Sequence, residues 1–408
     1  MPEGPGQRDN SRMPGRGSLV LFAGAVLLGV FWCLLYLPVA ARFFGFRSDY
    51  TIHIRYAQEL LRTHHLPVPH FLFQLLVLGV VKVFGASFEP ATLVVLALFS
   101  AMTGVLVYSE AAKVLIPGET PTAGLAFRAG LALALGATIL LMQPILKPGG
   151  SHIYQIGYLW AEPYLNPTYA LLKPLALASA VSGATFLRSG GASRTSIAVA
   201  AVATAAGALA KPSFVICLLP VVAILGLSRL ARREPLDQAA LLFGLVVPSL
   251  VVLIFEYYIA YSGFSSASTY QNAVVFAPLK VLGSYSGHLA AKLVLSAAFP
   301  VSVYVLYWRA AHRDVRFNFA MLLFLFGVAY SYLFAEKEHW RSANFLWSGY
   351  VTLFILFVFA ATFYVRELRK NPWVGVNAFR HLFCLVLLGC HVHSGILSEI
   401  AALREKLG

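Results

Sequence analysis

Asp49 is the residue of this chain best placed to take a proton from a substrate. It lies in SDYTIHIRYAQELLRT, shortly after the first long apolar run, and it is one of only four aspartates in 408 residues. At helical spacing, Asp49, His53 and Tyr56 fall near one face. Such a carboxylate can serve as a general base toward a hydroxyl group, with a pKa set by burial and by cations such as Arg55. The alternative is that Asp49 caps a surface helix.

A second polar cluster occupies KPGGSHIYQIGYLWAEPYLNPT, residues 147–168. Its candidates for binding a substrate are His152, Tyr154, Glu162 and Asn166. Rings can stack on a sugar while amides and carboxylates bond its hydroxyls. Two other interpretations stay open: the aromatic residues form a belt at a membrane interface, and Asn166 with its following proline begins a helix.

Cationic side chains that could face an anion occur in two further places. Lys211, in AKPSF, interrupts a long apolar stretch. It marks a tight turn between two helices or reaches a buried anion, since charges at membrane depth tend to be functional. In EKEHWRSANFLW, Lys337, His339 and Arg341 could clamp a phosphate or form a snorkelling, ion-paired helix end.

Composition predicts the elements that must position these residues. The chain is 59% hydrophobic with a mean hydropathy of +0.74, which favours an all-α, polytopic bundle of transmembrane helices because lipid requires backbone groups to be satisfied within each segment. The formal charge of +14 is ascribed to short loops meeting anionic lipid, not to nucleic-acid binding. The apolar segments run approximately over 19–41, 70–86, 90–108, 122–143, 167–187, 195–210, 213–228, 238–262, 288–308, 317–335, 346–365 and 382–396.

The distribution of Lys and Arg predicts the topology. If all twelve segments cross, four basic loops fall outside, against the positive-inside rule. Treating 70–86 as a juxtamembrane helix on the outer surface places all four inside. We therefore expect about eleven spanning helices plus that outer helix. Residues 1–17 would be a disordered basic cytoplasmic tail, and 18–408 a single transmembrane domain. The outer loops would be 42–69, 144–166, 263–287 and 336–345.

The order of these parts resembles the GT-C superfamily of integral-membrane glycosyltransferases. An acidic residue (Asp49) follows the first helix, a second acidic outer loop follows (His152 to Glu162), and then come a lysine in a helix turn (Lys211) and a basic outer loop (Lys337 to Arg341). HHLPVPHFLFQLL and VFGASFEPATLVV are similar to the region after the first outer loop in aminoarabinose and mannosyl transferases. The departure is that Asp49 has no acidic neighbour, which puts a metal-dependent mechanism in doubt.

The resemblance implies transfer of a sugar from a polyprenyl-phosphate donor to a glycan, lipid or protein acceptor, on the outer face of a bacterial inner or plasma membrane. Asp49 would be the general base. No cofactor is assigned, and a divalent metal stays open. One alternative is a polysaccharide polymerase or ligase that uses a lipid-pyrophosphate donor. Another is a transporter or flippase, which would carry charges along several helices; only Lys82 and Glu256 are expected well inside apolar runs.

Overall fold

Helices make up most of the structure, a computed structural model that describes residues 16–45, 48–116, 124–146, 156–162, 164–188, 190–261 and 273–404. The two strands in these residues, β1 (Val274–Phe276) and β2 (Phe334–Glu336), pair antiparallel with Val274 opposite Glu336. The expectation of an all-α, polytopic helical protein is confirmed at this level. Residues 1–15 of the expected N-terminal tail lie outside the described residues.

Each predicted apolar segment contains a helix, because runs rich in Leu, Val and Ala satisfy their backbone groups internally. The longer helices are α1 (Arg16–Arg42), α2 (Asp49–Thr63), α3 (Leu72–Phe84), α4 (Phe88–Leu115), α5 (Leu125–Leu141), α6 (Pro167–Phe186), α7 (Arg194–Ala210), α8 (Val215–Ala231), α10 (Val247–Tyr261), α15 (Val315–Leu333), α16 (Leu346–Lys370) and α17 (Gly375–Arg404). The shorter ones are η1 (Phe43–Gly45), α9 (Gln238–Leu241), the π-helical turn η2 (Leu242–Val246), α11 (Lys280–Tyr285), α12 (Leu289–Ser296), α13 (Ala298–Leu306), α14 (Trp308–Ala311) and η4 (Trp340–Ser342).

Among the described residues, seven helical stretches are long and apolar enough to cross a membrane. They are Gly17–Gly45, Phe88–Leu115, Pro167–Phe186, Gln238–Ile259, Val315–Leu333, Trp340–Lys370 and Gly375–Arg404. An eighth would be the α12–α13 pair, which is bent by 67°. Helices α3, α5, α7 and α8 are apolar but have 10–17 residues. The sequence-based count of eleven crossings therefore stays a prediction.

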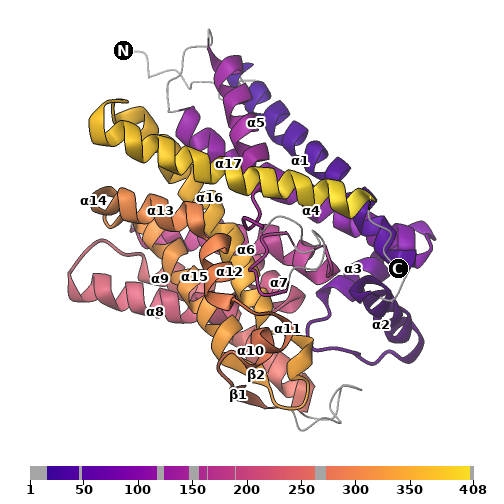
Figure 1. Ribbon diagram of the computed structural model, residues 1–408. Helices are drawn as coiled ribbons and strands as arrows, with labels where there is room; N and C mark the ends of the chain where they lie inside the picture. Colours follow the sequence, from indigo (N-terminus) through magenta and orange to yellow (C-terminus); the bar gives the residue numbers. More distant parts are fainter. Residues whose placement is uncertain are drawn as a thin grey trace, which may run out of the picture.

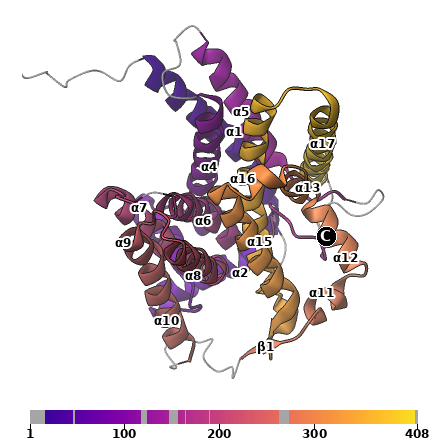
Figure 2. The same cartoon turned by 90° about the vertical axis from the view of Figure 1, so that its left-hand side faces the viewer.

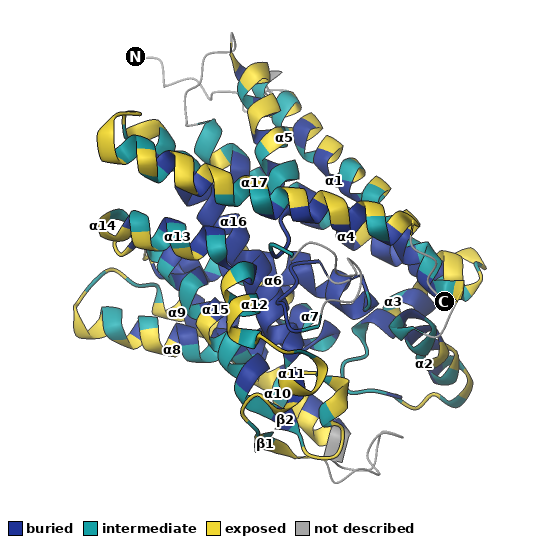
Figure 3. Cartoon of the chain, viewed as in Figure 1, coloured by how far each residue is buried: buried dark blue, intermediate teal, exposed yellow. Residues whose placement is uncertain are grey.

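Helices α6 and α16 form the centre of the molecule. In α6, 78% of the apolar window is buried inside the protein, and in α16 the value is 89%, compared with 22% in α1. Figure 3 shows the same contrast between dark-blue central helices and yellow stripes on α1, α5 and α17. In Figure 2, α7 to α10 lie on one side of the central pair α6 and α16. On the other side of this pair lie α12, α13 and α17, and α1, α4 and α5 stand above it.

The helix termini define two ends of the bundle (Figure 1). The 25 residues of α16 extend roughly 37 Å at ~1.5 Å per residue, enough to cross the ~30 Å hydrocarbon core of a bilayer. At its start, Trp347 contacts Lys211, and we call this the Asp49 end. Near its finish, Arg366 pairs with Asp314, which begins α15. We call this the Arg366 end.

Candidate functional site

Asp49 and Asn166, 117 residues apart in the chain, are joined by a side-chain hydrogen bond. Asn166 Nδ2 donates to Asp49 Oδ2 at 2.7 Å. The same amide caps α6, since Asn166 Oδ1 accepts from the Thr168 N–H at 2.9 Å and Pro167 occupies the first turn. The predicted capping role of Asn166 is confirmed: the amide oxygen caps the helix, and the amide NH2 group of the same side chain donates to Asp49.

Asp49 does not cap its helix, so that alternative is wrong. The cap of α2 is Ser48, which forms a capping box with Thr51. Asp49 is the first helical residue, where the helix dipole favours a negative charge. Burial raises the pKa of Asp49, and the hydrogen bond from Asn166 and the charge of Lys211 oppose that rise. A raised pKa makes the carboxylate a stronger base than an ordinary surface aspartate.

Lys211 combines the two roles that its sequence left open. It is the C-cap of α7 and begins the turn to α8, and its side chain is nevertheless buried. Its ammonium group lies 3.5 Å from Thr168 Oγ1 and over the ring of Trp347, 4.6 Å from the ring centroid. Burial lowers the pKa of Lys211 to about 8, against the opposing charges of Asp49 and Glu336. The cation is thus held beside Asp49 and Asn166.

A neutral imidazole flanks this group on the α2 side. His53 is buried and its Nδ1 lies 2.8 Å from Nε2 of Gln74 on α3. Burial, with the nearby His70 and Lys211, lowers the pKa of His53 well below its ordinary value. The ring of Tyr56 meets that of His53 edge-on at 5.8 Å, which agrees with the predicted shared face of α2.

Tyrosines pack beneath the start of α2 and connect it to α17. The hydroxyls of Tyr50 and Tyr36 are 2.8 Å apart, and the rings of Tyr36 and Tyr164 lie at 5.3 Å. Tyr164 in turn donates a hydrogen bond to Glu399 on α17. The buried surface behind Asp49 is therefore aromatic and hydrogen-bonded, which limits how far the helix can shift.

Glu162 makes its contacts with a different helix lysine from the one beside Asp49. Its carboxylate forms an ion pair with Lys173 of α6, and both side chains are at most 3% exposed. The Lys173 ammonium also lies over the rings of Phe354 and Trp32, at 4.4 and 5.2 Å. In the described contacts, Glu162 is thus engaged by a helix lysine and not by the Asp49 group.

Sequence reasoning missed Lys173, although a lysine in the middle of an apolar segment was a detectable signal. It also placed Lys82 deep in an apolar run, and this is corrected by the structure: Lys82 is in the last turn of α3 and is exposed. Gln74 was missed as well. It is fully buried, and its partner His53 becomes apparent only when α2 and α3 are packed together.

The basic segment before α16 is exposed near Lys211. Lys337, His339 and Arg341 are exposed, and Arg341 lies over the ring of Trp340 at 5.2 Å. Glu336, next to Lys337, is close enough to act on Lys211 electrostatically. The structure therefore brings this segment to the Asp49 end.

Two predicted residues, His152 and Tyr154, lie outside the described residues. Among the residues that are described, no group of three or more His, Cys, Asp or Glu side chains could hold a metal ion. The polar groups that come together instead are one carboxylate, one amide, one hydroxyl and one ammonium group (Asp49, Asn166, Thr168 and Lys211). Such a set can accept a proton at the carboxylate and stabilise an anion at the ammonium group.

Comparison with known proteins adds no family to this description: no family model, no curated protein and no solved structure matches the chain.

Proposed function

We propose that the chain is an integral-membrane glycosyltransferase of the GT-C type, which transfers a sugar from a polyprenyl-phosphate donor to an acceptor hydroxyl at the Asp49 end of the bundle. The observation that carries the proposal is that Asp49, Asn166 and Lys211, from three distant segments, come together in one largely buried group. Each of these residues was expected in the site on the sequence alone, and packing need not have united them.

In the proposed reaction, Asp49 takes the proton of the acceptor hydroxyl as its oxygen attacks the anomeric carbon of the donor. The bond from that carbon to the lipid phosphate breaks, and the phosphate leaves as an anion. Lys211 is a cation that acts electrostatically on Asp49 and would stabilise the leaving charge, with Lys337 and Arg341 available on the adjacent exposed segment. Asn166 holds the carboxylate in place through its amide.

The test is the pair of variants Asp49→Asn and Glu59→Gln. Both lie on α2 and each removes one negative charge, so they differ mainly in position. General-base catalysis contributes about 10²- to 10⁴-fold. Asp49→Asn should therefore slow transfer of labelled sugar from polyprenyl-phosphate donors by that factor, with normal expression and thermal stability. Glu59→Gln should retain activity. Wild-type rates in Asp49→Asn would reject the proposed role. Labelling that occurs only with a pyrophosphate donor would favour a polymerase or ligase.

A transporter or flippase is the second candidate, and one observation favours it. Buried charges lie on three long helices: Lys173 on α6, Glu256 on α10 and Glu399 on α17. Charges within spanning segments often mark transport pathways. The discriminating measurement is movement of a fluorescent lipid-linked sugar between leaflets of sealed vesicles. Movement that Glu256→Gln abolishes and Asp49→Asn spares would favour transport.

A further inference from the structure

Two hollows open side by side at the Arg366 end, and Arg313 lines both. One, of about 450 Å³, lies between the end of α8 and the start of α15, with Arg229 and Arg232 in its wall. The other, of about 560 Å³, lies between α14 and the end of α16, with Arg309 and Arg366 in its wall. Each is large enough to take a phosphate group with its attached glycerol or sugar.

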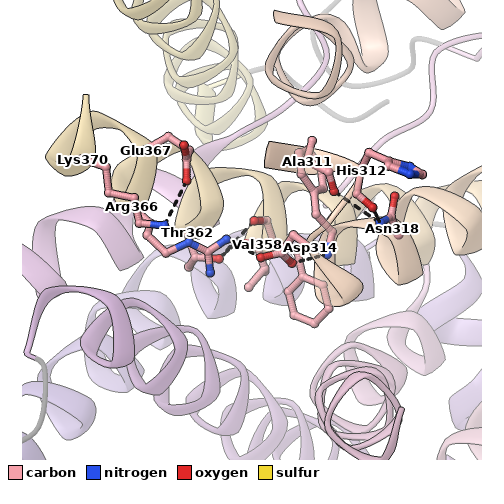
Figure 4. Close-up of polar contacts among 11 residues, drawn as sticks. Ala311, His312, Asp314, Asn318, Val358, Thr362, Arg366, Glu367 and Lys370 are labelled. Atoms are coloured by element: carbon pink, nitrogen blue, oxygen red, sulfur yellow. Dashed lines mark hydrogen bonds and ion pairs between the residues drawn. The ribbon is translucent and has the colours of Figure 1, made fainter. Parts of the chain in front are cut away.

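The turn between the hollows is held firmly (Figure 4). Asp314 caps α15 by accepting from the Phe317 N–H at 2.9 Å, and it also pairs with Arg366. Asn318 Nδ2 donates to the carbonyl oxygen of His312 at 2.7 Å. The backbone around Arg313 is therefore fixed from both sides, which lowers the entropy lost when a ligand binds there.

The walls of the two hollows carry more positively charged than negatively charged side chains. Arg229 is paired with Glu234 at 2.9 Å, and Arg366 is paired with Asp314. Within the described part of the chain, Arg232, Arg309 and Arg313 form no ion pair, and all three are exposed. Three guanidinium groups thus remain available to an anion, and guanidinium binds phosphate oxygens bidentately.

Aromatic side chains indicate the level of the hollows relative to a lipid bilayer. Trp308, next to Arg309, is 54% exposed and stacks on His312 with ring centroids 5.6 Å apart. Trp373, just beyond α16, is also 54% exposed. Exposed tryptophans at the ends of apolar helices sit at the level of lipid headgroups. We therefore expect the arginines beside them at the level of the lipid phosphates.

We propose that the hollows meeting at Arg313 bind the phosphate groups of anionic lipids in the leaflet at the Arg366 end. Basic pockets between transmembrane helices are suited to such headgroups. The proposal concerns the end of the bundle opposite Asp49 and does not depend on the function proposed for Asp49. Arg309 and Arg313 are its central ligands, because both line the second hollow, neither forms an ion pair in the described part of the chain, and Arg313 lies in the fixed turn.

The test uses the full chain in detergent, titrated with phosphatidylglycerol or phosphatidylcholine, with bound lipid counted by native mass spectrometry. The double variant Arg309→Gln/Arg313→Gln is compared with Arg188→Gln/Arg194→Gln, which removes the same charge from two exposed arginines outside the hollows. Each arginine near a headgroup strengthens binding by about fivefold. The first variant should therefore bind phosphatidylglycerol on the order of 10- to 30-fold more weakly, and the second within about twofold of wild type.

Two further arms complete the experiment. Arg309→Lys/Arg313→Lys keeps the charge and should bind more tightly than the glutamine pair; equal weakness of the two would overturn the proposal. Equal weakening by the Arg188/Arg194 control, or wild-type affinity in the glutamine pair, would overturn it as well.

Inorganic phosphate should compete poorly with the bound lipid. If it displaces the lipid at similar concentrations, the site serves a soluble phosphate and the assignment to lipid fails.

Discussion

At Asp49, opposing electrostatic effects act on one carboxyl group. Burial disfavours its ionised form, whereas the Asn166 amide and the Lys211 cation favour it. Lys211 experiences the reverse, because burial disfavours the cation and Asp49 favours it. The outcome is a carboxyl group with a raised pKa and an ammonium group with a lowered one, each acting on the charge of the other. Pairs of titratable groups shifted in this way are typical of sites that move protons.

These shifts predict the pH dependence of transfer. Asp49 must be ionised to accept a proton, so its raised pKa moves the acid limb above the ordinary aspartate value of about 3.9. Lys211 must be charged to stabilise an anion, and its pKa of about 8 places the alkaline limb there. The profile should be bell-shaped. Lys211→Arg, which keeps its charge at high pH, should move only the alkaline limb upward. An unchanged alkaline limb in that variant would assign the limb to another group.

At the scale of elements, the close crossing of α1 and α4 depends on two glycines. A Cβ placed on Gly104 would meet Gly29 Cα and the Leu28 carbonyl oxygen at 2.7 Å each. These are backbone atoms of α1, so no side-chain movement can relieve the overlap. Small residues let transmembrane helices approach in this way. Because α1 leads directly into the segment bearing Asp49, this crossing helps to position the site.

Gly104→Ala should therefore destabilise the protein, by about 1–3 kcal/mol if it behaves like other overpacked positions. Gly130→Ala is the matched control, since a Cβ there meets nothing within 4 Å and alanine is the better helix former by up to ~1 kcal/mol. Thermal unfolding in detergent should give a lower Tm for the first variant and an equal or higher Tm for the second. Equal melting temperatures would mean that α1 and α4 can separate without cost.

At the scale of the molecule, charged groups gather at the two ends of a bundle whose middle is largely apolar and holds few charges, such as Glu162, Lys173 and Glu256. Lys337 lies at the Asp49 end, and Arg188 follows α6 at the other end. Between them, Glu162 and Lys173 neutralise each other. Removing one partner of a buried pair leaves an uncompensated charge and is far more costly than losing both. Such an arrangement fits a protein that presents two different aqueous faces.

The topology deduced from charge makes a direct prediction. In intact cells, a membrane-impermeant maleimide should label Lys337→Cys, and it should label Arg188→Cys only after permeabilisation, because the predicted topology places the first outside and the second inside. Both positions are exposed, and the four native cysteines lie within helices. Labelling of the wild-type chain gives the background. Equal labelling of both variants from the outside would contradict the predicted topology.

The sequence by itself determined the helices and several of their ends. Apolar runs of sufficient length must become helices in lipid, and Asn166-Pro167 specified the start of α6, because these effects depend on neighbouring residues. It also supplied Asp49 and Lys211 as candidates by their rarity in apolar surroundings. The bend between α12 and α13 was not apparent, since the segment reads as one apolar run.

Only the tertiary structure decided which polar groups meet. Asn166 could have served as a cap alone, but packing of α2 against α6 turned its free amide to Asp49. Glu162 was a candidate for binding the same substrate, and packing pairs its carboxylate with Lys173. The physical reason is that buried charges must find partners wherever packing brings the helices together. Such partners lie at sequence separations that no local pattern encodes.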